Sequence, residues 1–324
     1  MIHRMLTAAL ALGLSVLAAP AQAFPDKPVR IVVPFSPGGG TDILARQVAE
    51  ALARAENWNV VVENRPGGNG AVALGAVARA PADGHQFVLA LRENLVISPL
   101  LNGASGSEMF DPLKDFTAIV HVADAPMVVA ARPDSEYGTM RQALDAAKAR
   151  PGALRFGTSG QGSMSHLLLA LLGKDAGARM THVPYKGSNP ALTDLVGGHV
   201  ELVGGSIASA KSFIDSGRVR PLAVSSLERA AALPDVPSIA ELGYPGFDVV
   251  TWYGFFGPAG MPRDVVDRIN QATVRVLQSP ELQRILKEQG MQTRIGSPAE
   301  FDRLFRDDYA GLAGQIGNLD MGPR

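Results

Sequence analysis

The chain has 324 residues, of which 46% are apolar and 19% charged, and its formal net charge is −1. It contains 35 glycines, 23 prolines and no cysteine, a composition that excludes a disordered chain, a zinc–cysteine module and a disulfide scaffold. The near-zero charge argues against a nucleic-acid-binding protein, because neutralising several phosphates requires an excess of clustered Lys and Arg. The length predicts a soluble protein of two lobes.

Residues 1–23 have the pattern of a cleaved secretory signal peptide. Arg4 precedes an unbroken run of small and apolar residues at 6–19, and Ala21-Gln22-Ala23 supplies the small-x-small cleavage pattern. The apolar run is shorter than the roughly 20 residues that span a bilayer, although a retained N-terminal anchor is the alternative. Loss of Arg4 leaves 29 basic and 31 acidic side chains, a net charge of about −2. We therefore expect a mature protein that begins at Phe24 and is exported.

The next part of the chain alternates short β-branched runs with longer helical patterns, which is typical of a parallel sheet with helical crossovers. This order of elements predicts one open α/β unit. Strands are expected at 29–33, 60–63 and 87–91, and helices at 42–54 and 71–79.

Strands at 117–122 and 127–131 are expected to lead into a second α/β unit. Capping boxes at Thr139 and Ser297 indicate helix starts in this part of the chain. No flexible linker separates the units, so we expect strands to join the lobes, with a hinge near Ala123 and Val250. Further strands are expected at 155–158, 181–183, 200–203 and 222–225, and an extended segment at 249–256. The predicted lobes are residues 24–123 plus 251–324, and residues 124–250.

A glycine-rich turn lies between the first strand and the first helix. Gly38, Gly39 and Gly40 let the backbone turn tightly, so that its N–H groups and the helix dipole can approach an anion. A carboxylate or a phosphate suits such a site, and a turn capped by Thr41 without a ligand is the alternative. Ile43 stands at the third glycine position of a dinucleotide fingerprint, and no Gly-Lys-Ser/Thr follows, which excludes both phosphate motifs.

A second glycine-rich turn, at 156–163, again joins a strand to a helix. Two anion-competent helix N-termini, one in each lobe, predict a ligand held between the lobes. Ser159 and Ser163 add hydroxyl donors, although Ser163 is equally suited to be a plain helix cap. His166, about one turn into the helix, either reaches the cleft or is structural.

Two more strand-to-helix loops carry charged side chains. Lys186 supplies a cation to the cleft or lies on the surface. Arg92 and Glu93 follow the third strand, at the end where open α/β sheets bind ligands. Arg92 can pair bidentately with a ligand carboxylate, or with Glu93 or another acid of the chain.

The sequence shows no motif for catalysis. It contains no Gly-x-Ser-x-Gly elbow, no His-Glu-x-x-His and no thiol nucleophile. Its six histidines are scattered without metal-ligand spacing. Binding is therefore favoured over catalysis, and we expect no metal and no cofactor.

Five motifs stand in an order that resembles the Bug-type substrate receptors of tripartite tricarboxylate transporters. They are Pro-Val-Arg-Ile-Val-Val-Pro-Phe-Ser-Pro-Gly-Gly-Gly-Thr-Asp (28–42), Val-Val-Glu-Asn-Arg-Pro-Gly (61–67), Asp-Pro-Leu-Lys-Asp-Phe-Thr (111–117), His-Val-Pro-Tyr-Lys-Gly (182–187) and Leu-Pro-Asp-Val-Pro-Ser (233–238). The likeness continues through Trp252-Tyr253-Gly254 and Pro258-Ala259-Gly260 to the final helices, and so covers nearly the whole mature chain.

The resemblance implies a periplasmic binding protein of the type II, Venus-flytrap α/β fold, with a ligand cleft between two lobes. It implies a small carboxylate as ligand and the permease subunits of a tripartite tricarboxylate-type transporter as partners. We expect a monomer that binds no nucleic acid. In the family, backbone amides, hydroxyls and ordered waters of loops from both lobes hold the carboxyl group. The positions predicted to bind the ligand are Phe35, Ser36, Gly38, Gly39, Gly40, Thr41, Asp42, Arg92, Thr158, Ser159, Gly160, Ser163, His166, Tyr185, Lys186, Gly187 and Ser206.

Two departures from the family pattern bear on the ligand. Arg92 and Glu93 stand where the family has small or hydroxylated residues, and Gly205 and Ser206 stand where many relatives carry a polar or acidic side chain. The cleft is therefore expected to prefer a dicarboxylate, unless Glu93 faces the same cavity and neutralises Arg92 or recruits an amino group. A secreted enzyme that uses His166 and a cleft carboxylate as acid and base is an alternative, as is a receptor that presents its ligand to a membrane kinase.

Overall fold

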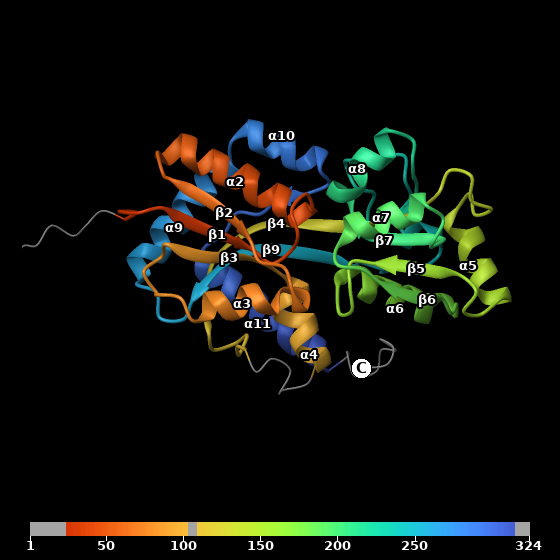
Figure 1. Cartoon of the computed structure of the whole chain (residues 1–324), viewed down its shortest axis with the longest axis horizontal. Helices are drawn as coiled ribbons and strands as arrows, with labels where there is room; N and C mark the ends of the chain where they lie inside the picture. The colour runs from red at the N-terminus through yellow and green to blue at the C-terminus, as the bar shows by residue number, and fades with distance from the viewer. Residues whose placement is uncertain (1–23, 103–108, 315–324) are drawn as a thin grey trace, which may run out of the picture.

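The computed structural model describes residues 24–102 and 109–314 of the chain (Figure 1). The predicted signal peptide at 1–23 lies outside these residues. Of the helices that the structure describes, none has both the length and the apolar character needed to cross a membrane.

The described residues form a sheet of ten strands with helices on its faces. The strands are β1 (Val29–Val33), β2 (Val60–Asn64), β3 (Gln86–Leu91), β4 (Phe116–Ala131), β5 (Arg155–Thr158), β6 (Thr181–Pro184), β7 (Leu202–Ser206), β8 (Arg220–Val224), β9 (Val250–Pro258) and β10 (Gln292–Thr293). The helices are α2 (Gly40–Glu56), α3 (Ala71–Ala78), α4 (Ser98–Asn102), α5 (Met140–Ala149), α6 (Met164–Ala176), α7 (Ser188–Val196), α8 (Ile207–Asp215), α9 (Arg263–Leu277), α10 (Pro280–Glu288) and α11 (Pro298–Ala313). Single turns occur at η1 (Gly68–Gly70), η2 (Glu93–Ile97) and η3 (Ala240–Leu242).

The strands divide into two sheets that share β4 (Figure 1). In the first sheet, β1 pairs in parallel with β2 and β3, and β9 runs antiparallel between β3 and the first part of β4. In the second sheet, β5 pairs in parallel with β6 and β7, and the last part of β4 runs antiparallel to β7 and β8. The two α/β units expected from the sequence are therefore present and are joined by a strand.

Strand β4 is continuous, so the prediction of two separate strands at 117–122 and 127–131 was wrong. Asp124 and Pro126 look like a break in the sequence because both residue types are depleted in strands. In the structure, Asp124 is hydrogen-bonded to His121 (2.7 Å) and accepts a bond from Arg294 (2.6 Å). Pairing with β9 continues through Pro126, which faces Val250. These contacts keep the segment extended.

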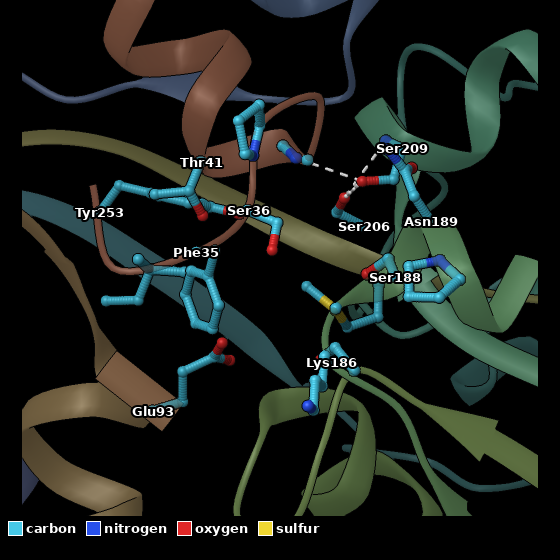
Figure 2. A pocket seen from close by; sticks show the side chains of 18 residues that line it. Phe35, Ser36, Thr41, Glu93, Lys186, Ser188, Asn189, Ser206, Ser209 and Tyr253 are labelled. Carbon is cyan, nitrogen blue, oxygen red and sulfur yellow. Dashed lines mark hydrogen bonds between the residues drawn. The ribbon is translucent and has the colours of Figure 1, made fainter. Parts of the chain in front are cut away.

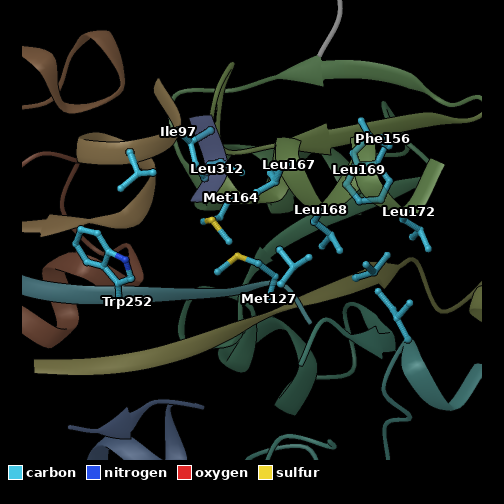
Figure 3. Close-up of a cluster of buried hydrophobic side chains, with 14 of the residues drawn as sticks. Ile97, Met127, Phe156, Met164, Leu167, Leu168, Leu169, Leu172, Trp252 and Leu312 are labelled. Atoms are coloured by element: carbon cyan, nitrogen blue, oxygen red, sulfur yellow. The ribbon is translucent and has the colours of Figure 1, made fainter. Parts of the chain in front are cut away.

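The side chains of each strand alternate between two faces, and the helices cover both. Ile31 and Val33 of β1 pack with α2, α9 and α10, whereas Val32 packs on the opposite face with α3 and α11. A single hydrophobic cluster on that second face extends from the first sheet to α5 and α6 of the second (Figure 3). Within it, Trp252 of β9 and Met127 of β4 lie below Ile97 and Met164 in the view of Figure 3, so both strands contribute to the same cluster.

Two local differences from the sequence expectations affect the site. The strand expected at 200–203 lies at Leu202–Ser206. Its second half was not predicted from the sequence because it contains two glycines, and glycine has a low β propensity. Gly204 is required there, since a Cβ would lie 2.8 Å from Cε1 of Phe156. After β3, the chain forms the π-helical turn η2 rather than a loop, and this turn carries Glu93.

Candidate functional site

One pocket lies where loops of the two sheets meet (Figure 2). Its volume of about 60 Å³ has room for a few water molecules, at roughly 10–15 Å³ each, so this conformation suits a small ligand. The lining residues are Phe35, Ser36, Pro37, Gly39, Gly40, Thr41, Leu91, Glu93, Met127, Ser159, Lys186, Gly187, Ser188, Asn189, Pro190, Ser206, Ser209 and Tyr253. Nine of them are among the predicted positions: Phe35, Ser36, Gly39, Gly40, Thr41, Ser159, Lys186, Gly187 and Ser206.

Asp42 and Gly38 shape the β1–α2 turn and are not part of the pocket lining. The buried Asp42 carboxylate accepts hydrogen bonds from the Gly38 amide (2.9 Å), Arg46 Nε (3.0 Å) and Asn64 Nδ2 (2.9 Å). Burial alone would raise the pKa of Asp42, but the bonds from Arg46, Gly38 and Asn64 outweigh it and hold the pKa below its ordinary value. Asp42 therefore stays ionised and fixes the turn.

The N-terminus of α2 is left without a side-chain cap by this turn. Its N-cap residue is Gly39, which has no side chain to accept from the first amides. The hydroxyls of Ser36 and Thr41 line the same end of the pocket, and neither makes a hydrogen bond among the described residues. Figure 2 shows the Ser36 side chain pointing into the pocket. The first amide of α2, at Gly40, donates to Ser209 Oγ (3.1 Å), so the two free hydroxyls, the amides that follow Gly40 and the positive helix end are what suit an anion.

The N-terminus of α7, on the other side of the pocket, is also uncapped. Its N-cap residue is Gly187, whose φ of 120° is a conformation that favours glycine. The amide of Gly187 donates to Ser159 O (3.0 Å), which holds the β6–α7 loop against the β5–α6 turn. The Ser188 hydroxyl makes no hydrogen bond within the described chain, and the exposed Lys186 forms no ion pair there.

The N-termini of α6 and α8 are, in contrast, satisfied by the protein itself. Ser163 caps α6, accepting from the His166 amide (3.2 Å) and donating to Gly160 O (2.7 Å). The first amide of α6, at Met164, donates to the Glu93 carboxylate (2.9 Å). Ser206 caps α8 and donates to Ser209 Oγ (2.8 Å). Among the described helices that begin at this pocket, α2 and α7 are therefore the two without a capping side chain.

Five of the predicted positions belong to the framework of the second sheet and lie outside the pocket lining: Thr158, Gly160, Ser163, His166 and Tyr185. Thr158 Oγ1 is hydrogen-bonded to His182 Nε2 (2.7 Å). The His182 ring stacks on His166, with 3.8 Å between the ring centroids, and burial lowers the pKa of His182 to about 4. The Tyr185 hydroxyl donates to Asp194 (2.8 Å) rather than to the pocket.

Arg92 also lies outside the pocket lining. Its guanidinium forms a two-pronged ion pair with Asp308 of α11, at 2.8 Å from Nε and 2.6 Å from the terminal nitrogen. Trp252 Nε1 donates to the same carboxylate (2.9 Å). The partner of Arg92 is thus another acid of the chain, which was the alternative to a ligand carboxylate.

Hydrogen bonds across the pocket join elements of the two sheets. The Gly40 amide at the start of α2 donates to Ser209 Oγ of α8 (3.1 Å). Asn189 Nδ2 of α7 donates to Gly38 O (3.0 Å), and the Glu93–Met164 bond joins η2 to α6. The pocket is therefore closed by direct contacts between its two sides.

Several lining residues were not predicted from the sequence. Ser188 and Asn189 begin α7, and Ser209 was placed only as a helix residue, although a serine at a helix start is a signal for either a cap or a site. Tyr253 lies in the middle of β9, where a buried aromatic residue is ordinarily core. Among the described residues, no group of three or more His, Asp or Glu is placed to hold a metal ion.

Comparison with curated proteins finds relatives over almost the whole chain. A protein encoded in the tcbD-tcbE intergenic region of Pseudomonas sp. strain P51 is 38% identical, covering 94% of this chain and 91% of the relative. Protein BugT of Bordetella pertussis is 33% identical, covering 93% and 92%.

Solved structures show the same fold. A Rhodopseudomonas palustris protein solved with adipate is 32% identical with a TM-score of 0.86, covering 91% of this chain and 99% of that one. MatC of the same organism, solved with malate, is 28% identical with a TM-score of 0.83, covering 90% and 100%. The model of the tripartite tricarboxylate transporter family receptor matches residues 44–319. The chain therefore belongs to this family of Bug-type solute-binding receptors, which have the two-lobe periplasmic binding protein fold and are not enzymes.

Proposed function

We propose that this protein is an extracytoplasmic receptor that captures a small carboxylated metabolite between its two lobes. The observation that carries the proposal is the pair of uncapped helix N-termini, α2 from one sheet and α7 from the other, at a single pocket. A helix N-terminus carries roughly half a positive charge and free N–H donors, so two of them provide a site for one carboxylate. The adipate and malate of the two R. palustris structures support this ligand class.

Hydroxyl groups complete the proposed carboxylate site. Ser36 and Thr41 lie at the α2 end and Ser188 at the α7 end, each with a hydroxyl that has no partner among the described residues. Lys186 adds a positive charge at the rim. The sequence predicted a carboxylate site between residues 38–41 and 159–163. We propose a site between residues 38–41 and the start of α7 instead, because the groups at the start of α6 are already hydrogen-bonded within the protein.

Ligand binding is proposed to close the two lobes about a hinge. Between Pro126 and Met127, β4 changes its partner from β9 to β7, and β9 begins at Val250. This supports lobes of residues 24–123 plus 251–324 and of residues 124–250, with bending near Ala123 and Val250. Closure forms the contacts across the pocket, so the ligand binds the closed state better.

A thermal-shift screen of carboxylic acids, with adipate and malate among them, tests the proposed ligand class. A ligand at about 100 times its dissociation constant adds roughly 2.7 kcal/mol to the free energy of unfolding, which raises the Tm measurably. Ser36→Ala and Ser188→Ala should each weaken binding of the best acid about tenfold, because each removes a hydrogen bond to a charged group. Ser212→Ala, on the exposed face of α8, is the matched control. If no carboxylic acid raises the Tm, the proposal fails.

The proposed periplasmic location and delivery to a tripartite tricarboxylate-type permease require separate tests. Cell fractionation should recover a chain that begins at Phe24 in the periplasmic fraction. Proteoliposomes that contain the cognate permease subunits should take up the identified acid only when the receptor is added. Uptake at the same rate without the receptor contradicts delivery.

A further inference from the structure

Glu93 is an acidic side chain in the pocket that the proposed carboxylate site does not use. It is only 5% exposed, and Figure 2 shows its carboxyl group directed into the pocket beneath the Phe35 ring. Among the described residues, its one hydrogen-bond donor is the Met164 amide, at 2.9 Å from Oε2. The other oxygen therefore has unused capacity to accept hydrogen bonds.

Within the described residues, no positively charged side chain forms an ion pair with Glu93. Arg92, its neighbour in the sequence, is held by Asp308, and Lys186 forms no ion pair within the described chain. Burial raises the pKa of Glu93 to about 7, and burial together with the Glu93 charge raises the pKa of the Tyr253 hydroxyl. An isolated buried carboxylate is costly unless a cation or further donors reach it.

We propose that Glu93 selects ligands that carry a protonated amine in addition to a carboxylate. The inference rests on the proposed function: the ligand carboxylate binds between α2 and α7, and the ammonium group binds Glu93. The Tyr253 hydroxyl lines the pocket without a partner in the described chain and can accept a second bond from the same ammonium. The class of ligand is thus an amino acid or a related aminocarboxylate.

The alternative ligand is a plain dicarboxylate, whose second carboxylate would meet Glu93. Two carboxylates at hydrogen-bond distance repel each other unless they share a proton. The expected preference for a dicarboxylate depended on Arg92 as its partner, and Arg92 is engaged by Asp308. The ammonium is therefore the better match to the pocket.

The two ligands differ in the direction of proton transfer on binding. An ammonium favours the ionised form of Glu93, so binding releases protons and the affinity falls as the pH decreases below about 7. A dicarboxylate that shares a proton with Glu93 takes up a proton, and its affinity rises as the pH decreases. The titratable and charged groups on the elements around Glu93 are Tyr253 on β9, Arg92 beside η2, Asp308 on α11, His166 on α6 and Lys186 before α7.

Calorimetric titration with matched pairs of compounds tests the proposal. Succinate is compared with aspartate, and adipate with 2-aminoadipate, since the members of each pair differ only in the amino group. We expect the amino member of at least one pair to bind at least tenfold more tightly to the wild-type protein. Glu93→Gln should remove this difference, whereas Glu228→Gln, an exposed carboxylate without an ion pair in the described chain, should retain it.

A second measurement needs only the wild-type protein. Titration at pH 6.5 in buffers of different ionisation enthalpy gives the number of protons exchanged, and we expect release. Tighter binding of the plain acids, with proton uptake, overturns the role of Glu93 while the receptor function stands. The role of Glu93 is also overturned if the Glu93→Gln variant prefers the amino compound as strongly as the wild-type protein does. If none of the four acids binds and no other carboxylate does, the proposed function fails as well.

Discussion

Gly40→Ala tests whether ligand binding requires the first turn of α2 to contact the start of α8. A Cβ on Gly40 would lie 2.8 Å from Ser206 Oγ and 3.3 Å from Ser206 Cβ. The Ser206 hydroxyl is held by Ser209, which also accepts the Gly40 amide hydrogen, so it has little freedom to move away. Overpacking of this kind costs about 1–3 kcal/mol. If the cost falls on the closed conformation alone, the dissociation constant rises by about 5- to 150-fold.

Calorimetry and urea denaturation separate this effect from a loss of folding. Alanine is a better helix former than glycine by up to about 1 kcal/mol, so the unliganded variant should keep or gain stability while its affinity falls. Gly311→Ala in α11 is the control, because its Cβ would meet no atom within 4 Å. Wild-type affinity in Gly40→Ala would refute the reasoning. An equal loss of unliganded stability would also refute it, since the contact would then not be specific to closure.

Three other substitutions address the framework of the site. Ser163→Ala should lower the free energy of unfolding in urea by about 1 kcal/mol, because it removes the cap of α6; an unchanged midpoint contradicts that role. Arg92→Gln should lower it by about 1–3 kcal/mol, because Asp308 loses its partner; a loss of ligand affinity without loss of stability would instead place Arg92 at the ligand. The pKa of His182 is about 4 in the fold against 6.5 for the free side chain, so the unfolded chain binds the proton first. Stability should therefore fall by about 1–3 kcal/mol as the pH drops from 6.5 to 4, after allowance for partial exposure, and His182→Gln should reduce this slope in urea melts.

Local signals in the sequence predicted most of the fold. Short β-branched runs predicted β1, β2 and β3, longer helical patterns predicted α2 and α3, and the capping boxes at Thr139 and Ser297 are formed in the structure. What the sequence missed depends on contacts between distant residues. Asp124 and Pro126 continue a strand because β9 and Arg294 hold them, and the glycines of β7 are extended because they pair with β4, with the Phe156 ring at the place where a Cβ of Gly204 would lie.

The pocket was predicted less completely than the fold. The strand-to-helix loops at 35–41 and 185–187 could be found because glycine turns and helix N-termini are local features. Whether a helix end is open depends on side chains that arrive from elsewhere. Glu93 reaches α6 from 71 positions away, and Asp308 takes Arg92 from 216 positions away. The Glu93 contact occupies the N-terminus of α6, which the sequence predicted as an anion site. The Asp308 contact occupies Arg92, which the sequence predicted as a cation for the ligand.

Recognition of the ligand and closure of the pocket involve the same side chain. Glu93 accepts a hydrogen bond from the Met164 amide across the pocket. A carboxylate accepts this bond more strongly than a protonated carboxyl group does, so a ligand ammonium that keeps Glu93 ionised also strengthens the bond to Met164. Protonation of Glu93 weakens both contacts at once. The Gly40–Ser209 and Asn189–Gly38 bonds join the same two sides but carry no titrating group. The strength of the Glu93 contact should therefore depend on ligand charge and pH, whereas the strength of the other two contacts should not. An aminocarboxylate strengthens both kinds of contact. A simple monocarboxylate at α2 and α7 strengthens only the contacts that do not titrate.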